Sequence, residues 1–553
     1  MLGEARSKGA IATAIATCTH SCLRHLNQPG EPMTHPVSSF EFIVSGVLLA
    51  FVGVPLTAQT GPEVARAFRE ANEASILRDF SELLAYPNRA RDTEDIRRTA
   101  AYIRDELLAV GVDSELLEIE GAPPIVYGEL MVPGAVRTLG IYVHYDGQAV
   151  DPTNWTHPPF TPTLYTAAME AGGQPRPFPE EGEAVDPEWR IYARSAGDDK
   201  APIAAILPVL RAFREAGIVP TSNLIFFLDG EEEAGSPHLG EYMERWKDRL
   251  EDIDIWLFFD GPAHPSGRPQ IVFGVRGSMG MEVTVYGATR NLHSGHYGNW
   301  APDTGNTLAR LLASMKDDTG RVLIEGWYDT VEPIGEEERA ALEGMPAWDE
   351  ELKRELGLVR TEGEPEALPE RLMVPALNVR GITSGNTGAL ARNVIPNTAV
   401  AALGIRLVKG NEPAHMRELV VDHIRRQGFH VVTEDPDMET RLLYPRIAKV
   451  TGEGGSSAAR TSMANPFAQN IMGAANAAAD RAFGPGSLVI APGMGGTLPL
   501  RHFTEVAQKP VIIVPVANHD NNQHAPDENL RIANLWYAID LYAALLTMPV
   551  TVF

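Results

Sequence analysis

The chain has 553 residues, of which 44% are hydrophobic and 22% charged, a composition typical of packed globular proteins. This length predicts at least two domains, and the composition excludes a largely disordered chain and a polytopic membrane protein. With 47 basic against 73 acidic side chains the formal net charge is −26, which repels phosphate backbones and argues against nucleic acid as a partner.

Residues 1–60 are predicted to form a leader region. An apolar run at residues 42–56 has the length of a signal-peptide core, is too short to span a bilayer, and ends in small residues up to Ala58. Residues 33–41 carry no Lys or Arg, unlike a typical signal peptide, and Met33 offers a second start. Cys18 and Cys22 precede the run and no cysteine follows it. We expect a secreted or periplasmic protein without a stable membrane anchor after leader removal, or a cytoplasmic one if export does not occur.

Residues 61–277 alternate apolar, strand-like runs with helical stretches. The runs occupy residues 139–143, 223–228 and 253–259, and a helix is predicted from residue 202. This alternation predicts an α/β domain with a mainly parallel sheet covered by helices. Residues 465–553 are expected to complete the same domain, because they add helices, two apolar runs and a closing helix.

Residues 278–464 have a different pattern and predict a smaller, inserted α+β domain. The expected order is strand, helix, strand, strand, helix, strand, with an acidic, proline-containing insertion at about residues 329–375.

Acidic and imidazole side chains follow the apolar runs of the first domain. In open α/β sheets the crevice beyond the carboxyl ends of the strands binds ligands. We therefore expect distant residues to meet there. The candidates are His144, Asp198, Glu232, Glu233, Asp260 and His524.

Each candidate has a plainer interpretation when taken alone. Asp198 precedes a helix and could be its N-cap. Glu232 and Glu233 could belong to a solvated charged turn, Asp260 could cap a turn, and His524 could be an ordinary loop histidine. The joint occurrence of two histidines, three carboxylates and a spare glutamate at one sheet edge favours a site.

The motifs VHYDGQ, ARSAGDDKAP, DGEEEAGS, FFDGP, NLHSG, GGTLP and NQHAPDE occur in this order. Together they resemble the M20 family of co-catalytic metallopeptidases, and among them its carnosine-dipeptidase-like branch. The resemblance extends from about residue 63 to the C-terminus.

The resemblance implies a centre of two divalent metal ions. It places His144 and Asp260 on one metal, Glu233 and His524 on the other, Asp198 between both, Glu232 as general base, and Asp146 as the residue that orients His144. Zinc is the metal that the family usually carries, and manganese or cobalt suit the same ligand types. Two metals about 4 Å apart can activate a shared water and polarise an amide carbonyl.

The resemblance also implies that residues 61–277 and 465–553 form the catalytic domain and that the inserted domain, residues 278–464, acts as a lid and as a dimerisation surface. It further implies substrate contacts from both domains. His293 would reach across a homodimer interface to the partner's site, and Arg406 would hold a substrate carboxylate, with Thr497 and Asn393 as further contacts. The plainer interpretations are a loop histidine for His293 and a surface ion pair for Arg406.

The chain departs from the family pattern in the pocket wall. Gly493-Met494 stands where related sequences often carry Arg-Glu, and Asn465 stands where a histidine is common. The expected activity is cleavage of dipeptides or other short peptides with a free carboxylate. The alternative is an N-acyl-amino-acid amidohydrolase. A non-catalytic dimeric binding protein on the same scaffold would lose a ligand or the base, whereas all six positions are filled here.

Overall fold

The computed structural model describes residues 59–452 and 454–549. The predicted leader, with Met33, Ala58 and both cysteines, lies outside the described residues. Within them, no helix combines the length and the apolar character that a bilayer crossing needs.

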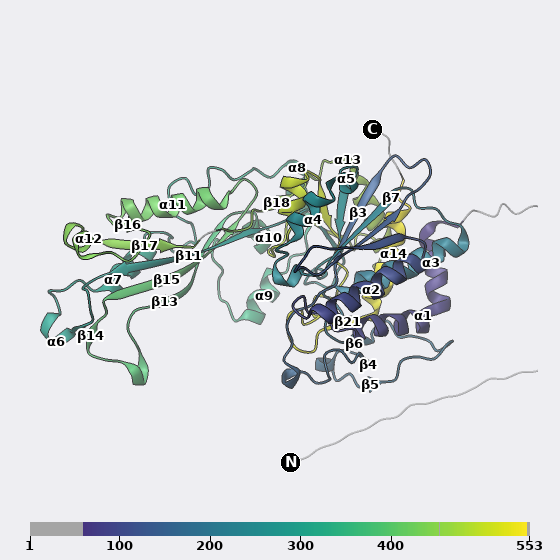
Figure 1. The fold of residues 1–553 in the computed structure, drawn as a ribbon, viewed down its shortest axis with the longest axis horizontal. Coiled ribbons are helices and arrows are strands. Elements are labelled where there is room, and N and C mark those ends of the chain that lie inside the picture. The colour runs from purple at the N-terminus through teal and green to yellow at the C-terminus, as the bar shows by residue number, and fades with distance from the viewer. Residues whose placement is uncertain (1–58, 453, 550–553) are drawn as a thin grey trace, which may run out of the picture. The chain divides into compact units, whose positions relative to one another are not determined.

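The largest sheet has eight strands in the order β1-β2-β7-β3-β8-β20-β9-β19. These are β1 (Asp113–Leu117), β2 (Ile125–Leu130), β3 (Thr138–His144), β7 (Asn223–Asp229), β8 (Ile255–Phe258), β9 (Gln270–Val272), β19 (Val489–Ala491) and β20 (Val511–Ile513). Figure 1 labels the neighbouring strands β3 and β7 of this sheet. Its centre, β7-β3-β8-β20, is parallel, as is the β9-β19 pair, whereas β1, β2 and the β20-β9 contact are antiparallel. The predicted α/β fold with a mainly parallel sheet is confirmed.

Helices cover this sheet because its central strands are apolar on both faces. Ile141 and Val143 of β3 pack into one core, while Tyr142 packs into the other. The first core also contains residues of α1 (Gly61–Ala85), α2 (Thr93–Ala109), α3 (Lys200–Ala216), α13 (Pro466–Phe483) and α14 (Ile532–Leu546). The second contains residues of α4 (Leu239–Arg245), α5 (Lys247–Leu250) and the π-helical η5 (His502–Val506).

A second sheet of five strands is built from the segment between Gly277 and Thr451. Its order is β13 (Ala376–Thr383), β15 (Thr398–Leu407), β11 (Gly277–Tyr286), β17 (Ile447–Thr451) and β16 (His430–Val432). With α7 (Thr304–Ala313) and α11 (Pro413–Arg426), it contains the predicted strand and helix order, and β17 is an additional strand inserted between β11 and β16. The acidic insertion contains α8 (Glu336–Gly344), α9 (Asp349–Leu356) and α10 (Leu368–Leu372).

A four-stranded antiparallel sheet, which the sequence did not predict, lies beside the catalytic segments. It has the order β21 (Asn529–Arg531), β6 (Arg190–Tyr192), β4 (Thr163–Tyr165) and β5 (Pro175–Arg176). The register pairs Asn529 with Tyr192, so the chain just after His524 lies beside the chain just before Asp198.

The remaining elements are short. They are η1 (Pro152–Asn154), η2 (Met169–Ala171), η3 (Glu232–Ala234), η4 (Gly388–Leu390), α6 (Ser294–Tyr297), α12 (Met438–Leu443), and the strand pairs β10 (Gly274–Val275) with β18 (Ala459–Arg460) and β12 (Leu292–His293) with β14 (Val394–Ile395).

Candidate metal centre

Three of the predicted ligands follow neighbouring parallel strands at their carboxyl ends, and two come from loops. His144 is the last residue of β3, Glu233 follows β7 on η3, and Asp260 follows β8. His524 lies on the loop between β20 and β21, and its φ of 61° places its backbone in the left-handed region that non-glycine residues seldom adopt. Asp198 lies between β6 and α3. Parallel pairing brings these strand ends to one edge.

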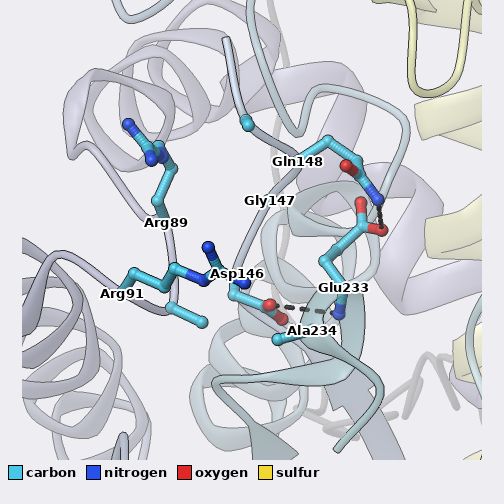
Figure 2. Close-up of a pocket in the computed structure, with 9 residues that line it drawn as sticks. Arg89, Arg91, Asp146, Gly147, Gln148, Glu233 and Ala234 are labelled. Carbon is cyan, nitrogen blue, oxygen red and sulfur yellow. Dashed lines mark hydrogen bonds between the residues drawn. The ribbon is translucent and has the colours of Figure 1, made fainter.

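Asp146 fixes the backbone of the segment that carries Glu232 and Glu233. It is fully buried, and its two carboxylate oxygens accept hydrogen bonds from the backbone N–H of Glu232 and of Glu233, each at 3.1 Å. Its Oδ1 also lies 3.3 Å from Nδ1 of His144. Gln148 donates from Nε2 to Oε2 of Glu233 at 2.7 Å (Figure 2). One carboxylate therefore fixes the segments of a predicted ligand and of the predicted base.

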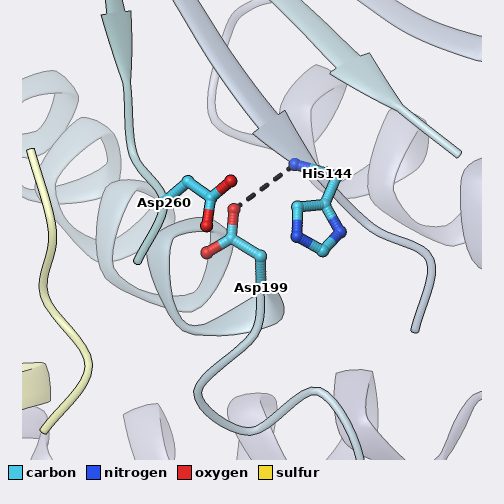
Figure 3. Close-up of side chains that lie close together, drawn as sticks. All are labelled: His144, Asp199 and Asp260. Carbon is cyan, nitrogen blue, oxygen red and sulfur yellow. Dashed lines mark hydrogen bonds between the residues drawn. The ribbon is translucent and has the colours of Figure 1, made fainter. Parts of the chain in front are cut away.

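Six side chains form two groups that could each hold a metal ion. In each group the ligand atoms all lie within 4.8 Å of one another. The first group is His144, Asp199 and Asp260, and the second is Asp198, Glu233 and His524 (Figure 3 shows the first). Imidazole and carboxylate donors of this kind fit zinc, and also manganese or cobalt.

Asp198 connects the two groups. Its Oδ1 lies 2.8 Å from Nε2 of His144, and its Oδ2 lies 3.1 Å from Nε2 of His524. The same imidazole nitrogen of His524 is 3.3 Å from Oε2 of Glu233. One carboxylate oxygen of Asp198 therefore lies toward the first group and the other lies toward the second. A ligand shared by two metal ions needs this arrangement.

Asp199 is a candidate ligand that the sequence analysis did not single out. It is buried in the first group, and its Oδ2 accepts from the backbone N–H of His144 at 3.3 Å (Figure 3). In the sequence both aspartates precede a predicted helix, a position that is ordinarily explained by N-capping. Asp199 does occupy the N-cap position of α3, yet its side chain makes no capping hydrogen bond. Both carboxylates face the site instead.

Glu528 is a second residue that sequence reasoning missed. It is fully buried, and its carboxylate accepts from the backbone N–H of Ser195 at 3.0 Å and of Gly197 and Asp198 at 2.9 Å each. Arg194 neutralises it at 2.5 Å. Glu528 therefore fixes the turn that presents Asp198, and the only signal was its place at the end of the motif NQHAPDE.

Burial and crowding shift the acidity of the site. Burial, together with the nearby charge of Asp198, raises the pKa of Glu233 to about 7. Burial also raises the pKa of Asp260 to about 6 and that of Glu232 well above its usual range. Burial opposes ionisation of Asp198 too, but hydrogen bonds with His144 and His524 hold its pKa below the usual range. So many buried carboxylates call for compensating positive charge, which divalent cations supply.

Glu232 remains outside both ligand groups. It begins η3, next to Glu233, and its backbone N–H is bound to Asp146. A free carboxylate beside the ligand groups can accept a proton from a water molecule and pass it on.

The predicted substrate contacts form two pairs. Arg406 donates from Nη1 to Oγ1 of Thr497 at 3.1 Å. His293 is exposed at the end of β12, and its Nδ1 accepts from the N–H of Gly295 at 3.0 Å. Asn393 precedes β14, which pairs with β12. In the part of the chain that the structure describes, no hydrogen bond or ion pair joins either pair to the metal-ligand groups.

Two residues that depart from the family pattern, Asn465 and Met494, make defined contacts in the structure. Asn465 caps α13, because its side chain accepts from the N–H of Phe467 at 2.9 Å. Met494 donates its backbone N–H to Gly274 at 3.0 Å, and its side chain packs among the apolar residues of the second core.

Comparisons with known proteins define the class. Residues 140–548 match the peptidase family M20/M25/M40, and the chain belongs to this family. The Cys-Gly metallodipeptidase of Candida albicans is 25% identical over 455 residues, which cover 79% of this chain and 86% of the relative. The Beta-Ala-His dipeptidase of Homo sapiens is 26% identical over 431 residues, which cover 76% of each chain.

Solved structures show the same architecture. An M20 family metallo-carboxypeptidase of Sulfolobus solfataricus superposes with a TM-score of 0.66 at 28% identity, covering 86% of this chain and 98% of that one. Human carnosine dipeptidase 1 has the same fold, with a TM-score of 0.59 at 23% identity, covering 88% and 98%. The prediction of an M20 metallopeptidase that resembles the carnosine-dipeptidase branch is confirmed.

Proposed function

We propose that this protein hydrolyses the amide bond of dipeptides or other short peptides that carry a free carboxylate. The observation that supports it most directly is the position of Asp198, with one carboxylate oxygen toward His144 and the other toward His524. Relatives named as Cys-Gly and Beta-Ala-His dipeptidases support the substrate class.

The chain's own residues supply binding and proton transfer. Two divalent cations, which we propose to be zinc, with manganese or cobalt as alternatives, supply Lewis acidity and an activated water when bound. Glu232, whose carboxylate lies outside both ligand groups, would take a proton from the attacking water and deliver it to the leaving nitrogen. Arg406, positioned by Thr497, binds the substrate carboxylate through its planar guanidinium.

A Glu232→Ala variant tests the assignment of the base. We expect turnover of Ala-Ala to fall at least about a hundredfold, because a positioned general base contributes this much. Metal content, measured by inductively coupled plasma mass spectrometry, should stay unchanged. The matched control Glu241→Ala, on the exposed face of α4, should keep normal activity. Near-normal hydrolysis by the Glu232 variant would refute the assignment.

A substrate panel separates the peptidase from an amidohydrolase of N-acyl amino acids. The purified, metal-loaded protein is given dipeptides and the matching N-acetyl amino acids at equal concentration. We expect faster hydrolysis of the dipeptides. A consistent preference for the N-acetyl compounds would favour the amidohydrolase alternative.

We further propose a homodimer formed through the five-stranded sheet. Its edge strand β13 is exposed from Asn378 to Thr383, with Ile382 61% exposed, and Trp300 nearby in sequence to α6 is 80% exposed. Unpaired edges and exposed apolar side chains of this kind mark contact surfaces. Sedimentation equilibrium measures the association directly.

Mixed dimers test whether His293 acts in the partner's site. A His293→Ala subunit keeps its own Glu232, and a Glu232→Ala subunit keeps His293. If His293 acts across the interface, mixing the two inactive variants restores activity at one site of each mixed dimer. No recovery after subunit exchange would place His293 outside the partner's site.

Export is also a proposal, supported by the apolar run at residues 42–56. Expression of the full chain in a bacterium with a periplasm, followed by mass measurement of the N-terminus in each fraction, tests it. A processed periplasmic protein is expected, and an unprocessed cytoplasmic one would contradict it.

A further inference from the structure

An arginine-lined cavity adjoins the candidate metal centre. Its volume is about 210 Å³, and it is lined by residues 89–91, 146–149 and 233–234. Figure 2 shows Arg89 and Arg91 on one side, with Gln148 and Glu233 across from them. Glu233 belongs both to a metal-ligand group and to the cavity wall. A substrate held at the metals can therefore extend into this cavity.

Arg91 is available to bind a ligand there. Arg91 is exposed, and its guanidinium makes no hydrogen bond or ion pair in the part of the chain that the structure describes. Arg89 has only a loose partner, with Nη1 at 3.6 Å from Oδ2 of Asp92. Asp146 also lines the cavity, but its carboxylate pairs with His144, and in the described residues no ion pair joins it to Arg91.

The local charge contrasts with the charge of the whole chain. A net charge of −26 repels anions from most of the surface. Arg89 and Arg91 place two guanidinium groups at this cavity, which Asp146 and Glu233 also line. These two carboxylates face imidazoles of the site, Asp146 at 3.3 Å from Nδ1 of His144 and Glu233 at 3.3 Å from Nε2 of His524, so the guanidinium of Arg91 is left for an anion. A guanidinium can bind a carboxylate with two parallel hydrogen bonds, which are stronger than bonds between neutral groups.

The lining residues indicate which part of a substrate enters. All of them come from the loops after α1, β3 and β7, and none comes from the five-stranded sheet or the segment around Thr497. If Arg406 and Thr497 hold the C-terminal carboxylate, the cavity is left for the residue on the acyl side of the scissile bond.

We propose that Arg91, assisted by Arg89, binds an anionic side chain on the acyl side of the scissile bond, so that peptides with an N-terminal glutamate or aspartate are preferred substrates. This inference rests on the proposed dipeptidase function and specifies its substrate class.

The test compares kcat/KM for Glu-Ala and Gln-Ala, which differ in charge and hardly in shape. The metal-loaded full chain should prefer Glu-Ala by roughly tenfold, because the bond to an ionised carboxylate is about twice as strong as its neutral counterpart. Arg91→Gln should remove this preference, and Arg89→Gln should reduce it less, since Asp92 already lies near Arg89. The matched control Arg98→Gln loses the same charge from exposed α2 without lining the cavity, and should keep the preference.

An unchanged ratio in Arg91→Gln, or an equal fall in Arg98→Gln, overturns the inference while leaving dipeptide hydrolysis intact. If no dipeptide is hydrolysed, the proposed function fails. The binding of Glu-Ala and Gln-Ala, measured by calorimetry, then tests whether the cavity selects an anionic side chain. Tighter binding of Glu-Ala that depends on Arg91 supports it, and equal binding overturns it. Free glutarate tests whether the cavity binds a small anion from solution and not a substrate side chain. If glutarate binds in the presence of Gln-Ala, and Glu-Ala is not preferred over Gln-Ala, the substrate assignment is overturned.

Discussion

Glu528 shows how one buried carboxylate can hold the centre without contacting a metal. It accepts three backbone N–H groups of the turn before and at Asp198 and pairs with buried Arg194. Glu528→Gln should lower the free energy of unfolding by about 3 kcal/mol, because it leaves a buried guanidinium without its counter-charge. Urea denaturation measures the change.

The control for Glu528→Gln is Glu188→Gln. Glu188 is exposed and pairs with Arg531 at the surface, where such pairs contribute about 0–1 kcal/mol. Equal, small decreases in the free energy of unfolding for both substitutions would show that the buried Glu528–Arg194 pair stabilises the fold no more than a surface ion pair does.

His264 predicts how stability responds to acid. Burial, with the nearby charges of Arg268 and His519, lowers the pKa of His264 from 6.5 to about 4. Between these values the unfolded chain binds a proton that the folded chain does not, so His264 makes stability fall as the pH drops from 6.5 to 4. His264→Asn keeps an acceptor for the Ser266 N–H and should weaken this fall, measured as urea midpoints at pH 7 and 4.5.

His415→Asn is the control for the loss of stability in acid. His415 is half-buried on helix α11, in the segment that forms the five-stranded sheet. This variant should leave the difference between the two urea midpoints unchanged. A His264 variant that loses as much stability in acid as the parent would contradict the assignment.

At the scale of elements, the sequence revealed the strands that are buried on both faces. The runs that became β3, β7, β8 and β20 are continuous and apolar, so their pattern cannot belong to a solvated loop. β17 was missed because its five residues alternate weakly. The small sheet of β4, β5, β6 and β21 was missed because strands of two or three residues have no period to detect.

The same reasoning explains what the sequence showed of the site. Residues that directly follow long apolar runs, such as His144 and Asp260, were identified by that position. Asp199 was hidden because an aspartate before a helix already has an ordinary explanation. Glu528 was hidden because its partners are backbone N–H groups of a turn more than 300 positions earlier in the sequence, and only the folded register of β21 and β6 brings them together.

Gly140 is a packing constraint on the strand that ends in His144. A Cβ on Gly140 would lie 2.4 Å from Cε3 of buried Trp256. Gly140→Ala should therefore lower the free energy of unfolding by about 1–3 kcal/mol through overpacking. Gly381→Ala is the matched control, because a Cβ there meets nothing within 4 Å. Equal unfolding midpoints for the two variants would contradict this prediction.

At the scale of the whole molecule, metal loading should raise stability. The two ligand groups bring four carboxylates together, and cations that bind only the folded chain stabilise it by mass action. Removing metal with a chelator should lower the melting temperature by several degrees, and zinc should restore it; saturation at 1,000 times Kd corresponds to about 4 kcal/mol. Circular dichroism melts measure the shift.

His524→Ala provides the comparison for metal loading, because it removes one donor from the second group. Its melting temperature should rise less on zinc addition than that of the parent. A parent protein that melts at the same temperature with chelator and with zinc would exclude a structural effect of the ions.

The pairing of β10 with β18 has a consequence for how the chain can be divided. Val275 lies opposite Ala459 and Gly274 opposite Arg460, so the inserted sheet leaves and rejoins the catalytic part at adjacent points. Adjacent ends can be joined by a short linker at little entropic cost. Replacing residues 277–457 with a few glycines and serines should give a miniature protein that keeps all six candidate ligands and still binds metal, without Arg406 to recognise a substrate. The inserted sheet could then be exchanged between relatives as a cassette, which would change how the substrate carboxylate is recognised while the metal scaffold and the Arg91 cavity stay the same.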